Sequence, residues 1–287
     1  KTLGGKNMKK SILLVLASLF VISCSSTVAK ENTMEKTNKE KAVELLRVFE
    51  TRSDKPIEYI NPNKYIQHNL GAADGVEGFK ALIASLPPST AKTDIVRVIE
   101  DGNYVITHSI DDSSEPTVGF DIFKFENGKI VEHWDNLQAA VAKTPSGHTM
   151  IDGATEIKDL DKTKENKELV EKFVLGFLVN GDMAAVDKYL DSTSYVQHNP
   201  GIADNVEGLQ QALKYFMDNK MSFKYDKVHM ILGEGNFVLT VSEGEIGGVH
   251  SSFYDLFRVE NGKIVEHWDT IEAIPTKENW KNTNGKF

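Results

Sequence analysis

The chain has 287 residues, a formal net charge of −9, 40% hydrophobic residues and a single cysteine. This length predicts about two domains of ordinary size, and the hydrophobic fraction excludes a disordered chain. The acidic balance excludes sequence-independent binding to nucleic acid, because such binding requires a basic surface that releases counterions. One cysteine excludes an intrachain disulfide and a cysteine-rich zinc site.

The first 23 residues have the order of a secretory signal peptide. Two lysines follow Met8, residues 12–22 are almost wholly apolar, and Val21-Ile22-Ser23 precedes Cys24. The apolar run is too short to span a bilayer, which takes about 20 residues. The sequence Val-Ile-Ser-Cys resembles the lipobox of bacterial lipoproteins, whose cysteine is acylated and becomes the new N-terminus.

We therefore predict an upstream extension and lipoprotein signal peptide over residues 1–23 and lipidation of Cys24. A plain secretory peptide with an incidental cysteine is the alternative. The protein would then lie at the bacterial cell envelope and contact the membrane only through its lipid, because an acidic chain is repelled by anionic headgroups. Residues 24–37 are polar and rich in lysine and glutamate, which is typical of a flexible tether.

Two motifs occur twice along the rest of the chain. Residues 65–78 match residues 195–208 at ten of fourteen positions, and residues 125–135 match residues 259–269 at ten of eleven. A repeat with so long a period indicates a duplicated domain rather than a solenoid. The predicted first domain, linker and second domain with its C-terminal tail are 38–142, 143–163 and 164–287.

Each copy is expected to begin with helices and to end in an antiparallel meander. A helix with apolar residues at helical spacing follows a Thr37-x-x-Glu40 capping box, and its counterpart ends at Asn180-Gly181. Another helix is expected near Val76 and near Val206. The predicted strands, paired through Asn-Gly hairpin turns, are 93–100, 103–110, 117–126, 129–136, 223–232, 236–246, 251–260 and 263–271. Helices followed by a meander define an α+β fold.

This order carries Tyr-x-Gln-His-Asn before the third helix and Asn-Gly-Lys-Ile-Val-Glu-His-Trp-Asp on the last strand. Both features resemble the SnoaL-like polyketide cyclase group of the NTF2-like superfamily, especially proteins described as SnoaL-like aldol-condensation enzymes. The resemblance implies two tandem NTF2-like (cystatin-like) cones, each with helices packed on a curved antiparallel sheet around an apolar pocket. It also implies a small-molecule ligand, chemistry without a cofactor, and packing of the two domains as an intrachain pseudo-dimer.

The His-Trp-Asp strand offers the best candidate for a catalytic base. Side chains alternate along a strand, so His133 and Asp135 share one face while Trp134 points to the other. If the first face lines the pocket, Asp135 is the base and His133 its partner, and His267 and Asp269 repeat the pair. The alternatives are that the pair closes the barrel mouth, or that Trp134 and Trp268 form the pocket wall.

A second set of candidate substrate-binding residues surrounds the Gln-His-Asn motif. It comprises Gln67, His68, Asn69, Gln197, His198, Asn199 and, on a strand of copy one, His108. Anchoring of a loop is the alternative role for the motif. Copy two has Val241 in place of His108 and Glu272 in place of Gln138, so the two pockets are not chemically equivalent.

A metal site is not expected. The set His68, His108, His133 and Asp135 has ligand types that suit zinc or iron, but it lacks a tight His-x-x-x-His spacing. Nucleotide-binding loops and nucleophile elbows are also missing from the sequence. The sequence therefore predicts a lipid-anchored protein that binds a small apolar carbonyl compound, with cofactor-free aldol-type, isomerase or hydrolase-like chemistry. A non-catalytic binding or dimerisation module at the envelope is the alternative.

Overall fold

The computed structural model of the protein describes residues 35–86 and 92–287. The predicted signal peptide, the lipidation site Cys24 and most of the predicted tether lie outside these residues. From Lys36 to Phe287 the chain forms one compact unit. Across the described ranges, no helix combines the length and the apolar character needed to cross a bilayer.

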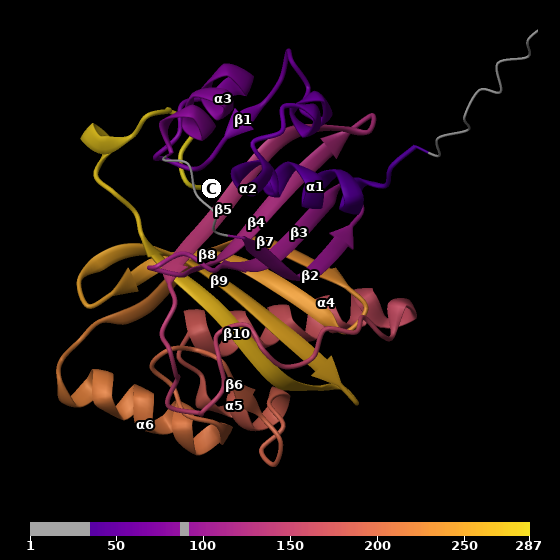
Figure 1. Ribbon diagram of the computed structural model, residues 1–287. Helices are drawn as coiled ribbons and strands as arrows, with labels where there is room; N and C mark the ends of the chain where they lie inside the picture. The colour runs from indigo at the N-terminus through magenta and orange to yellow at the C-terminus, as the bar shows by residue number, and fades with distance from the viewer. Residues whose placement is uncertain (1–34, 87–91) are drawn as a thin grey trace, which may run out of the picture. The chain divides into compact units, whose positions relative to one another are not determined.

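The first half of this unit has three α-helices and a five-stranded sheet (Figure 1). The capping box predicted at the start of its first helix is confirmed, since the Thr37 side chain and the Glu40 side chain each bond to the other residue's backbone N–H. The elements are α1 (Asn38–Leu46), α2 (Val48–Thr51), the 3-10 helix η1 (Lys55–Tyr59), β1 (Ile66–Gln67), α3 (Gly75–Ser85), β2 (Thr93–Asp101), β3 (Tyr104–Asp111), β4 (Thr117–Glu126) and β5 (Lys129–Ala139).

The second half repeats this order. Its first helix passes into a π-helical turn that ends at Asn180, where Gly181 takes the positive φ that glycine tolerates. The elements are η2 (Leu160–Lys162), α4 (Thr163–Phe173), the π-helix η3 (Val174–Val179), α5 (Met183–Tyr189), β6 (Val196–Gln197), α6 (Asn205–Asp218), β7 (Phe223–Glu234), β8 (Phe237–Ile246), β9 (Val249–Glu260), β10 (Lys263–Ala273) and η4 (Lys277–Asn279).

Both sheets have the same topology, β1-β5-β4-β3-β2 and β6-β10-β9-β8-β7. Four strands of each form the predicted antiparallel meander, so the predicted α+β class is confirmed. The two-residue strand β1 was not expected, and it pairs in parallel with β5 so that Gln67 lies beside His133. A bulge between Lys124 and Phe125 shifts the register of β4 against β5 and brings Asp121 opposite Asp135.

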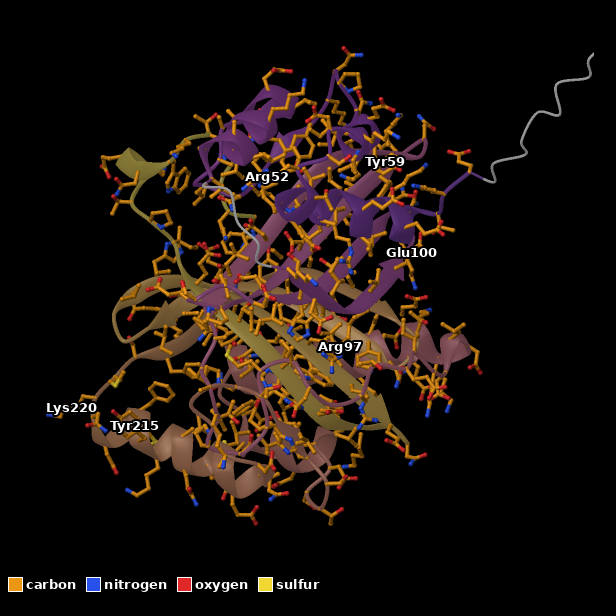
Figure 2. All side chains as sticks on the ribbon, in the orientation of Figure 1. Arg52, Tyr59, Arg97, Glu100, Tyr215 and Lys220 are labelled. Carbon is orange, nitrogen blue, oxygen red and sulfur yellow. The ribbon has the colours of Figure 1, made fainter. Side chains whose placement is uncertain are left out.

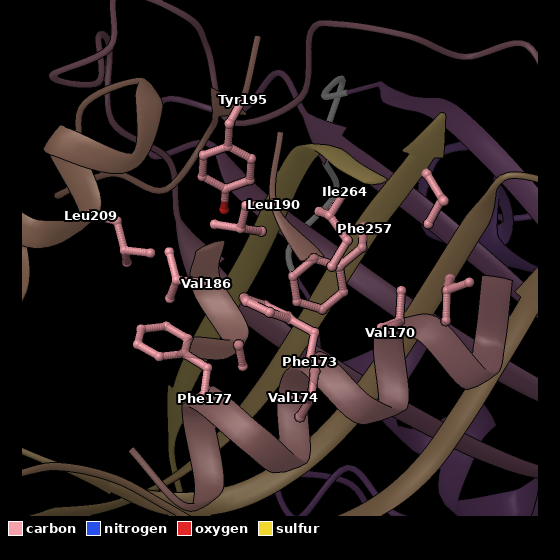
Figure 3. Close-up of a cluster of buried hydrophobic side chains, with 13 residues drawn as sticks. Val170, Phe173, Val174, Phe177, Val186, Leu190, Tyr195, Leu209, Phe257 and Ile264 are labelled. Atoms are coloured by element: carbon pink, nitrogen blue, oxygen red, sulfur yellow. The ribbon is translucent and has the colours of Figure 1, made fainter. Parts of the chain in front are cut away.

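Each sheet has one face on its own helices and the other on the second sheet. In the second half, α4, η3 and α5 cover the sheet through a buried cluster that includes Phe173, Phe177 and Phe257 (Figure 3). Another cluster joins Phe120 and Trp134 of the first sheet to Trp268 and other residues of the second. Apolar burial of this kind is the main contribution to stability, so the two halves share part of one core.

Two segments cross from one half to the other. The segment after β5 lies on the second half, where the Ser146 hydroxyl donates to the Gln197 carbonyl at 2.7 Å. The segment after β10 lies on the first half, where the Asn282 amide donates to the carbonyls of Asn69 and Ala72 at 2.8 and 2.9 Å. In Figure 1 this second crossing is the yellow chain that runs from β10 to the region of β1 and α3.

Candidate functional site

A cavity of about 480 Å³ lies in the first domain, between its helices and the sheet face opposite the shared core. Its wall is largely apolar, and one group of its polar residues, Gln67, Asn69, Asp121, His133 and Asp135, lies where β1, β4 and β5 meet. The lining residues are Leu45, Leu46, Phe49, Glu50, Arg52, Gln67, Asn69, Phe79, Leu82, Leu86, Thr93, Ser109, Asp111, Ser113, Thr117, Gly119, Asp121, Phe123, His133, Asp135 and Leu137.

The second domain has a cavity of about 530 Å³ in the corresponding place. Both volumes lie within the range of about 300–1,000 Å³ that is typical of small-molecule sites. Its polar residues include Gln197, Asn199, Asp255, His267 and Asp269. Aromatic side chains at Phe173, Phe177, Tyr195, Tyr215, Phe216, Phe223, Tyr225 and Phe257 form much of its wall, and Tyr215 is labelled in Figure 2. The face that carries His133 and Asp135, and its copy, is therefore the face that lines the cavities.

The hydrogen bonds around His133 determine where the protons on its ring nitrogens lie. The backbone N–H of Asn69 donates to Gln67 Oε1 at 2.9 Å, so this atom of the Gln67 amide is the oxygen. The same oxygen lies 2.9 Å from His133 Nδ1, which must therefore carry a proton. His133 Nε2 lies 3.1 Å from Asp121 Oδ1, and one further proton is shared between these two atoms. The Asp121–His133 pair is therefore neutral as a whole and holds a transferable proton.

Asp135 lies directly across from Asp121 in the sheet, and both side chains are buried. The Asn69 amide donates to Asp135 Oδ2 at 2.5 Å. Within the described residues, Asp135 Oδ1 has no hydrogen-bond partner. Burial raises the pKa of Asp121, and the hydrogen bond from His133 opposes that rise only in part. The first cavity thus joins one carboxylate with an unused oxygen to one pair that holds a proton.

The second cavity repeats this arrangement. Gln197 Oε1 accepts from the backbone N–H of Asn199 at 3.0 Å and lies 2.8 Å from His267 Nδ1. His267 Nε2 lies 3.0 Å from Asp255 Oδ1, and the Asn199 amide donates to Asp269 Oδ2 at 2.6 Å. Asp269 Oδ1 has no hydrogen-bond partner in the part of the chain that the structure describes. The two cavities therefore present the same four side-chain types in the same roles.

The second cavity also shows strong electrostatic coupling. Burial raises the pKa of Asp269 to about 6, and the nearby carboxylate of Asp255 adds to this, while His267 opposes it. Burial alone would lower the pKa of His267, but the hydrogen bond to Asp255 and the charge of Asp269 outweigh it and raise that pKa. The Tyr225 hydroxyl donates to both oxygens of Asp255 at 3.2 Å, a contact for which copy one has Thr93 in the matching place of the strand.

The other predicted substrate-binding residues lie on the opposite side of the sheets. The rings of His68 and Trp134 stack at 4.7 Å between centroids, and those of His198 and Trp268 stack at 4.8 Å. Trp134 and Trp268 belong to the core that the two sheets share. Because side chains alternate along β5 and β10, these tryptophans point away from the cavities, which corrects their expected place in the binding site.

His68 and His198 hold the crossing segments. His68 Nδ1 lies 2.9 Å from the Gly285 carbonyl and Nε2 lies 3.1 Å from Glu132, while His198 contacts the Thr149 carbonyl and Glu266 in the same way. Neither histidine lines a cavity. These contacts therefore fit the alternative role, in which the histidines anchor a loop.

His108 is also buried away from the first cavity. Its Nδ1 accepts from the guanidinium of Arg97 at 3.1 Å, and its ring stacks on Phe120. Burial and the Arg97 charge hold the pKa of His108 well below its usual value, so the ring is neutral. Arg97, labelled in Figure 2, donates to the carbonyls of Ile151, Asp152 and Ala154 in the linker. His108 thus belongs to the contact between the domains and not to the binding site.

Asp121 and Asp255 are cavity residues that the sequence reasoning missed. Each is the one acid within an apolar stretch of its strand, Gly-Phe-Asp-Ile-Phe at 119–123 and Phe-Tyr-Asp-Leu-Phe at 253–257. An acid at such a position is buried at a cost, so it marks a site with a specific partner. That signal was present in the sequence.

Ligand-type atoms of Asp121, His133 and Asp135 lie within 4.8 Å of one another, as do those of the matching residues in the second domain. These atoms are of types that divalent metals bind. Both ring nitrogens of His133 are already engaged, by Gln67 and by Asp121, so a metal ion would have to displace one of these contacts. The absence of a metal stays a prediction.

Comparison with known proteins gives the same class for both halves. The family model of the SnoaL-like domain matches residues 27–133 and again residues 170–267. The chain therefore belongs to the SnoaL-like domain family and carries two tandem SnoaL-like domains. None of the curated proteins compared with the chain matches it.

Several solved structures resemble one half of the chain. TsrD from Streptomyces laurentii is 17% identical, with 37% of this chain and 91% of that chain covered and a TM-score of 0.31. A candidate polyketide cyclase from Bacillus cereus ATCC 10987 is 21% identical, with 36% and 75% covered and a TM-score of 0.32. An NTF2-like protein of unknown function from Cytophaga hutchinsonii ATCC 33406 is 24% identical, with 42% and 95% covered and a TM-score of 0.30.

Proposed function

We propose that each cavity binds a small, largely apolar carbonyl compound and moves protons on it without a cofactor. The observation that carries this proposal is the carboxylate oxygen Oδ1 of Asp135 and of Asp269, which lacks a hydrogen-bond partner in the described structure. Each atom belongs to a buried aspartate that lines a largely apolar cavity. A base in such a place is little solvated and accepts a proton readily.

The chemistry follows from the positions of the protons. Asp135 takes a proton from the carbon next to the substrate carbonyl, and an enolate begins to form. The proton shared by Asp121 and His133 passes to the carbonyl oxygen, so no net charge develops in the cavity. Gln67 keeps Nδ1 of His133 protonated and so directs Nε2 toward Asp121. The enol can then add to a second carbonyl, be reprotonated at another carbon, or lead to bond cleavage.

Exchange of hydrogen for deuterium tests the first step without knowledge of the final reaction. The protein is incubated in D₂O with a panel of ketones, aldehydes and 1,3-dicarbonyl compounds, and deuterium at the α-carbon is followed by mass spectrometry and NMR. We expect Asp135→Asn and Asp269→Asn each to abolish exchange in one cavity. The double variant should lose about 10²-fold or more, in line with the loss of a general base. Asp94→Asn, an exposed acid on β2, is the matched control.

A bound compound with no exchange would contradict the catalytic proposal. Calorimetry on the same panel detects that outcome, because binding would then survive in the double variant while no deuterium enters. The protein would in that case be a binding module of the envelope. Exchange that persists in the double variant would show that neither aspartate is the base.

We further propose that the chain is a lipoprotein of the bacterial cell envelope, attached through Cys24. The basic start, the short apolar run and the Val-Ile-Ser-Cys sequence support this. Metabolic labelling with an alkyne fatty acid should mark the full-length protein in the membrane fraction, and Cys24→Ala should lose the label. An unlabelled protein of unchanged location would contradict the anchor.

We also propose that the two domains act as an intrachain pseudo-dimer. The core that contains both Trp134 and Trp268 supports this, as do the amide of Asn136 and its 2.8 Å hydrogen bond to the Thr270 carbonyl. Asn136 and Thr270 occupy equivalent positions of the repeat, which is the relation expected at the axis of a two-fold dimer.

A further inference from the structure

The C-terminal segment places a buried lysine beside Asp135, a residue that lines the first cavity. Lys286 Nζ lies 3.6 Å from Asp135 Oδ1 and 2.7 Å from Glu272 Oε2, and only 3% of its side chain is exposed. The segment is fixed there by the amides of Asn282 and Asn284, which donate to backbone carbonyls of residues 67–72. A buried ammonium group needs paired charges, and here the second domain's segment supplies the cation beside the first domain's base.

The second cavity has a methionine in the equivalent place. His68 Nδ1 contacts the carbonyl of Gly285, and His198 Nδ1 contacts the carbonyl of Thr149. The residue after each carbonyl is Lys286 in one case and Met150, which is also buried, in the other. No ion pair joins Asp269 to a lysine or arginine in the described part of the chain.

A second pair of equivalent positions, next to the first, also differs between the two domains. Glu272 accepts from the backbone N–H of Leu137, and Gln138 accepts from the backbone N–H of Ile271, each at 2.9 Å. Glu272 and Gln138 are equivalent in the repeat, so the acid occurs only where the lysine does. The first cavity therefore has a Lys–Glu pair beside its base, and the second has a Met–Gln pair.

The other titratable groups around Asp135 come from every element that packs against it. Asp121 of β4 and His133 of β5 form the neutral pair described above. Glu272 of β10 is bonded to Lys286, and the hydroxyls of Tyr65 and Tyr254 remain protonated, because burial and these carboxylates raise their pKa values. Lys286 is thus the cation that directly neutralises Asp135.

We propose that Lys286 is a positioning residue that keeps Asp135 ionised, so that the two cavities are active in different pH ranges. This inference rests on the proposed function. The first cavity then works in acid and neutral solution, whereas the second works only once Asp269 has lost its proton. Burial raises the pKa of Asp269 to about 6, which places that change between mildly acidic and neutral pH. One chain would then have a single active cavity in acid solution and two active cavities at neutral pH.

Carboxyl titration by NMR tests this without a substrate. The full chain is labelled with ¹³C at the aspartate side-chain carboxyl carbon, and Asp135→Asn and Asp269→Asn assign the two signals. We expect Asp135 to titrate at lower pH than Asp269. Exchange of the local pair by Lys286→Met with Glu272→Gln should raise the Asp135 midpoint by about half a pH unit or more. This is less than the full effect of losing a nearby opposite charge, because the Glu272 carboxylate is lost with the lysine.

The reverse exchange, Met150→Lys with Gln138→Glu, should lower the Asp269 midpoint by a similar amount. Lys281→Met, an exposed lysine of the same segment, is the matched control and should move neither signal. Lys286→Arg keeps the charge and should preserve the wild-type order of the two midpoints.

An Asp135 midpoint that Lys286→Met with Glu272→Gln leaves unchanged would overturn the proposal. If that variant fails to fold, the reverse exchange decides, since an unmoved Asp269 signal would overturn the proposal in the same way. A correct order of midpoints in a protein that exchanges no deuterium on any carbonyl would instead refute the proposed function and leave the role of Lys286 intact.

Discussion

The two aspartates of each cavity face each other across neighbouring strands, a position in which two negative charges repel. His133 and His267 relieve this repulsion, because each shares a proton with one member of the pair. The second aspartate is then the member of this cluster that carries the net charge, and its surroundings decide whether it is ionised. In an apolar cavity the neutral acid is favoured unless a cation lies near. Among the described residues, a lysine pairs with Asp135 in the first cavity, and no lysine or arginine pairs with Asp269 in the second.

The raised pKa of Asp269 makes a prediction about stability. The folded protein holds the Asp269 proton up to about pH 6, whereas the unfolded chain releases it near the ordinary value of 3.8. Because the folded state binds more protons in this window, the contribution of Asp269 to the free energy of unfolding falls as pH rises. The whole decrease amounts to about 3 kcal/mol.

Asp269→Asn removes this titration and keeps the shape of the side chain. The free energy of unfolding of the variant, relative to wild type, should therefore increase by about 2 kcal/mol between pH 4 and pH 7, which is most of the whole decrease. Urea unfolding followed by circular dichroism at several pH values measures this difference. For the exposed acid on β2, Asp94→Asn should give a difference that changes little with pH. A constant difference for the Asp269 variant would contradict the shift.

At the scale of the elements, the strands were largely predictable because their signals are local. The Asn-Gly turns at 127–128 and 261–262 take the positive φ angles that such hairpins require, and the strands on both sides follow the expected ranges closely. The face of β5 that lines the cavity was left open by the sequence. Alternation alone places His133 and Asp135 on the same face of the strand, but it does not show whether that face lines the cavity.

A single extra residue in the pairing of β4 with β5 decides which side chain lies opposite Asp135. Counting back from the hairpin turn without a bulge would place Asp121 opposite Trp134, and the bulge after Lys124 moves it opposite Asp135. No local sequence pattern marks that bulge. Similarly, β1 has two residues and forms only because β5 is already in place, so its pairing could not be read from propensity. The site therefore depends on register that is set by tertiary contacts.

At the scale of the whole molecule, duplication was evident from the two repeated motifs, but the exchange of segments between the halves was not. The linker appeared as a polar connection, yet Ser146 and His148 contact Gln197 and Asp204 of the second domain. The C-terminal segment does the same for the first domain. The second cavity is thus lined in part by Pro145 of the linker, and Asp135 of the first cavity contacts Lys286 of the C-terminal segment.

Removal of the C-terminal segment should affect the first domain, although the segment belongs to the second. A chain that ends at Thr276 loses the backbone hydrogen bond from Lys281 to the Leu70 carbonyl and those of the Asn282 amide to the carbonyls of Asn69 and Ala72. Each such bond contributes about 1 kcal/mol. The amides of residues 70–75 should therefore exchange with deuterium at least about tenfold faster, as measured by mass spectrometry.

The matching loop of the second domain, residues 199–205, provides the internal control. It is held by the linker, through the Ser146 hydroxyl on the Gln197 carbonyl and the Thr149 carbonyl on His198, and the truncation leaves these contacts in place. Its exchange should not change, whereas Ser146→Ala should accelerate this loop and spare the first. Equal acceleration of both loops by the truncation would mean that the segment stabilises the molecule as a whole, and that the two crossings do not act separately on the two cavities.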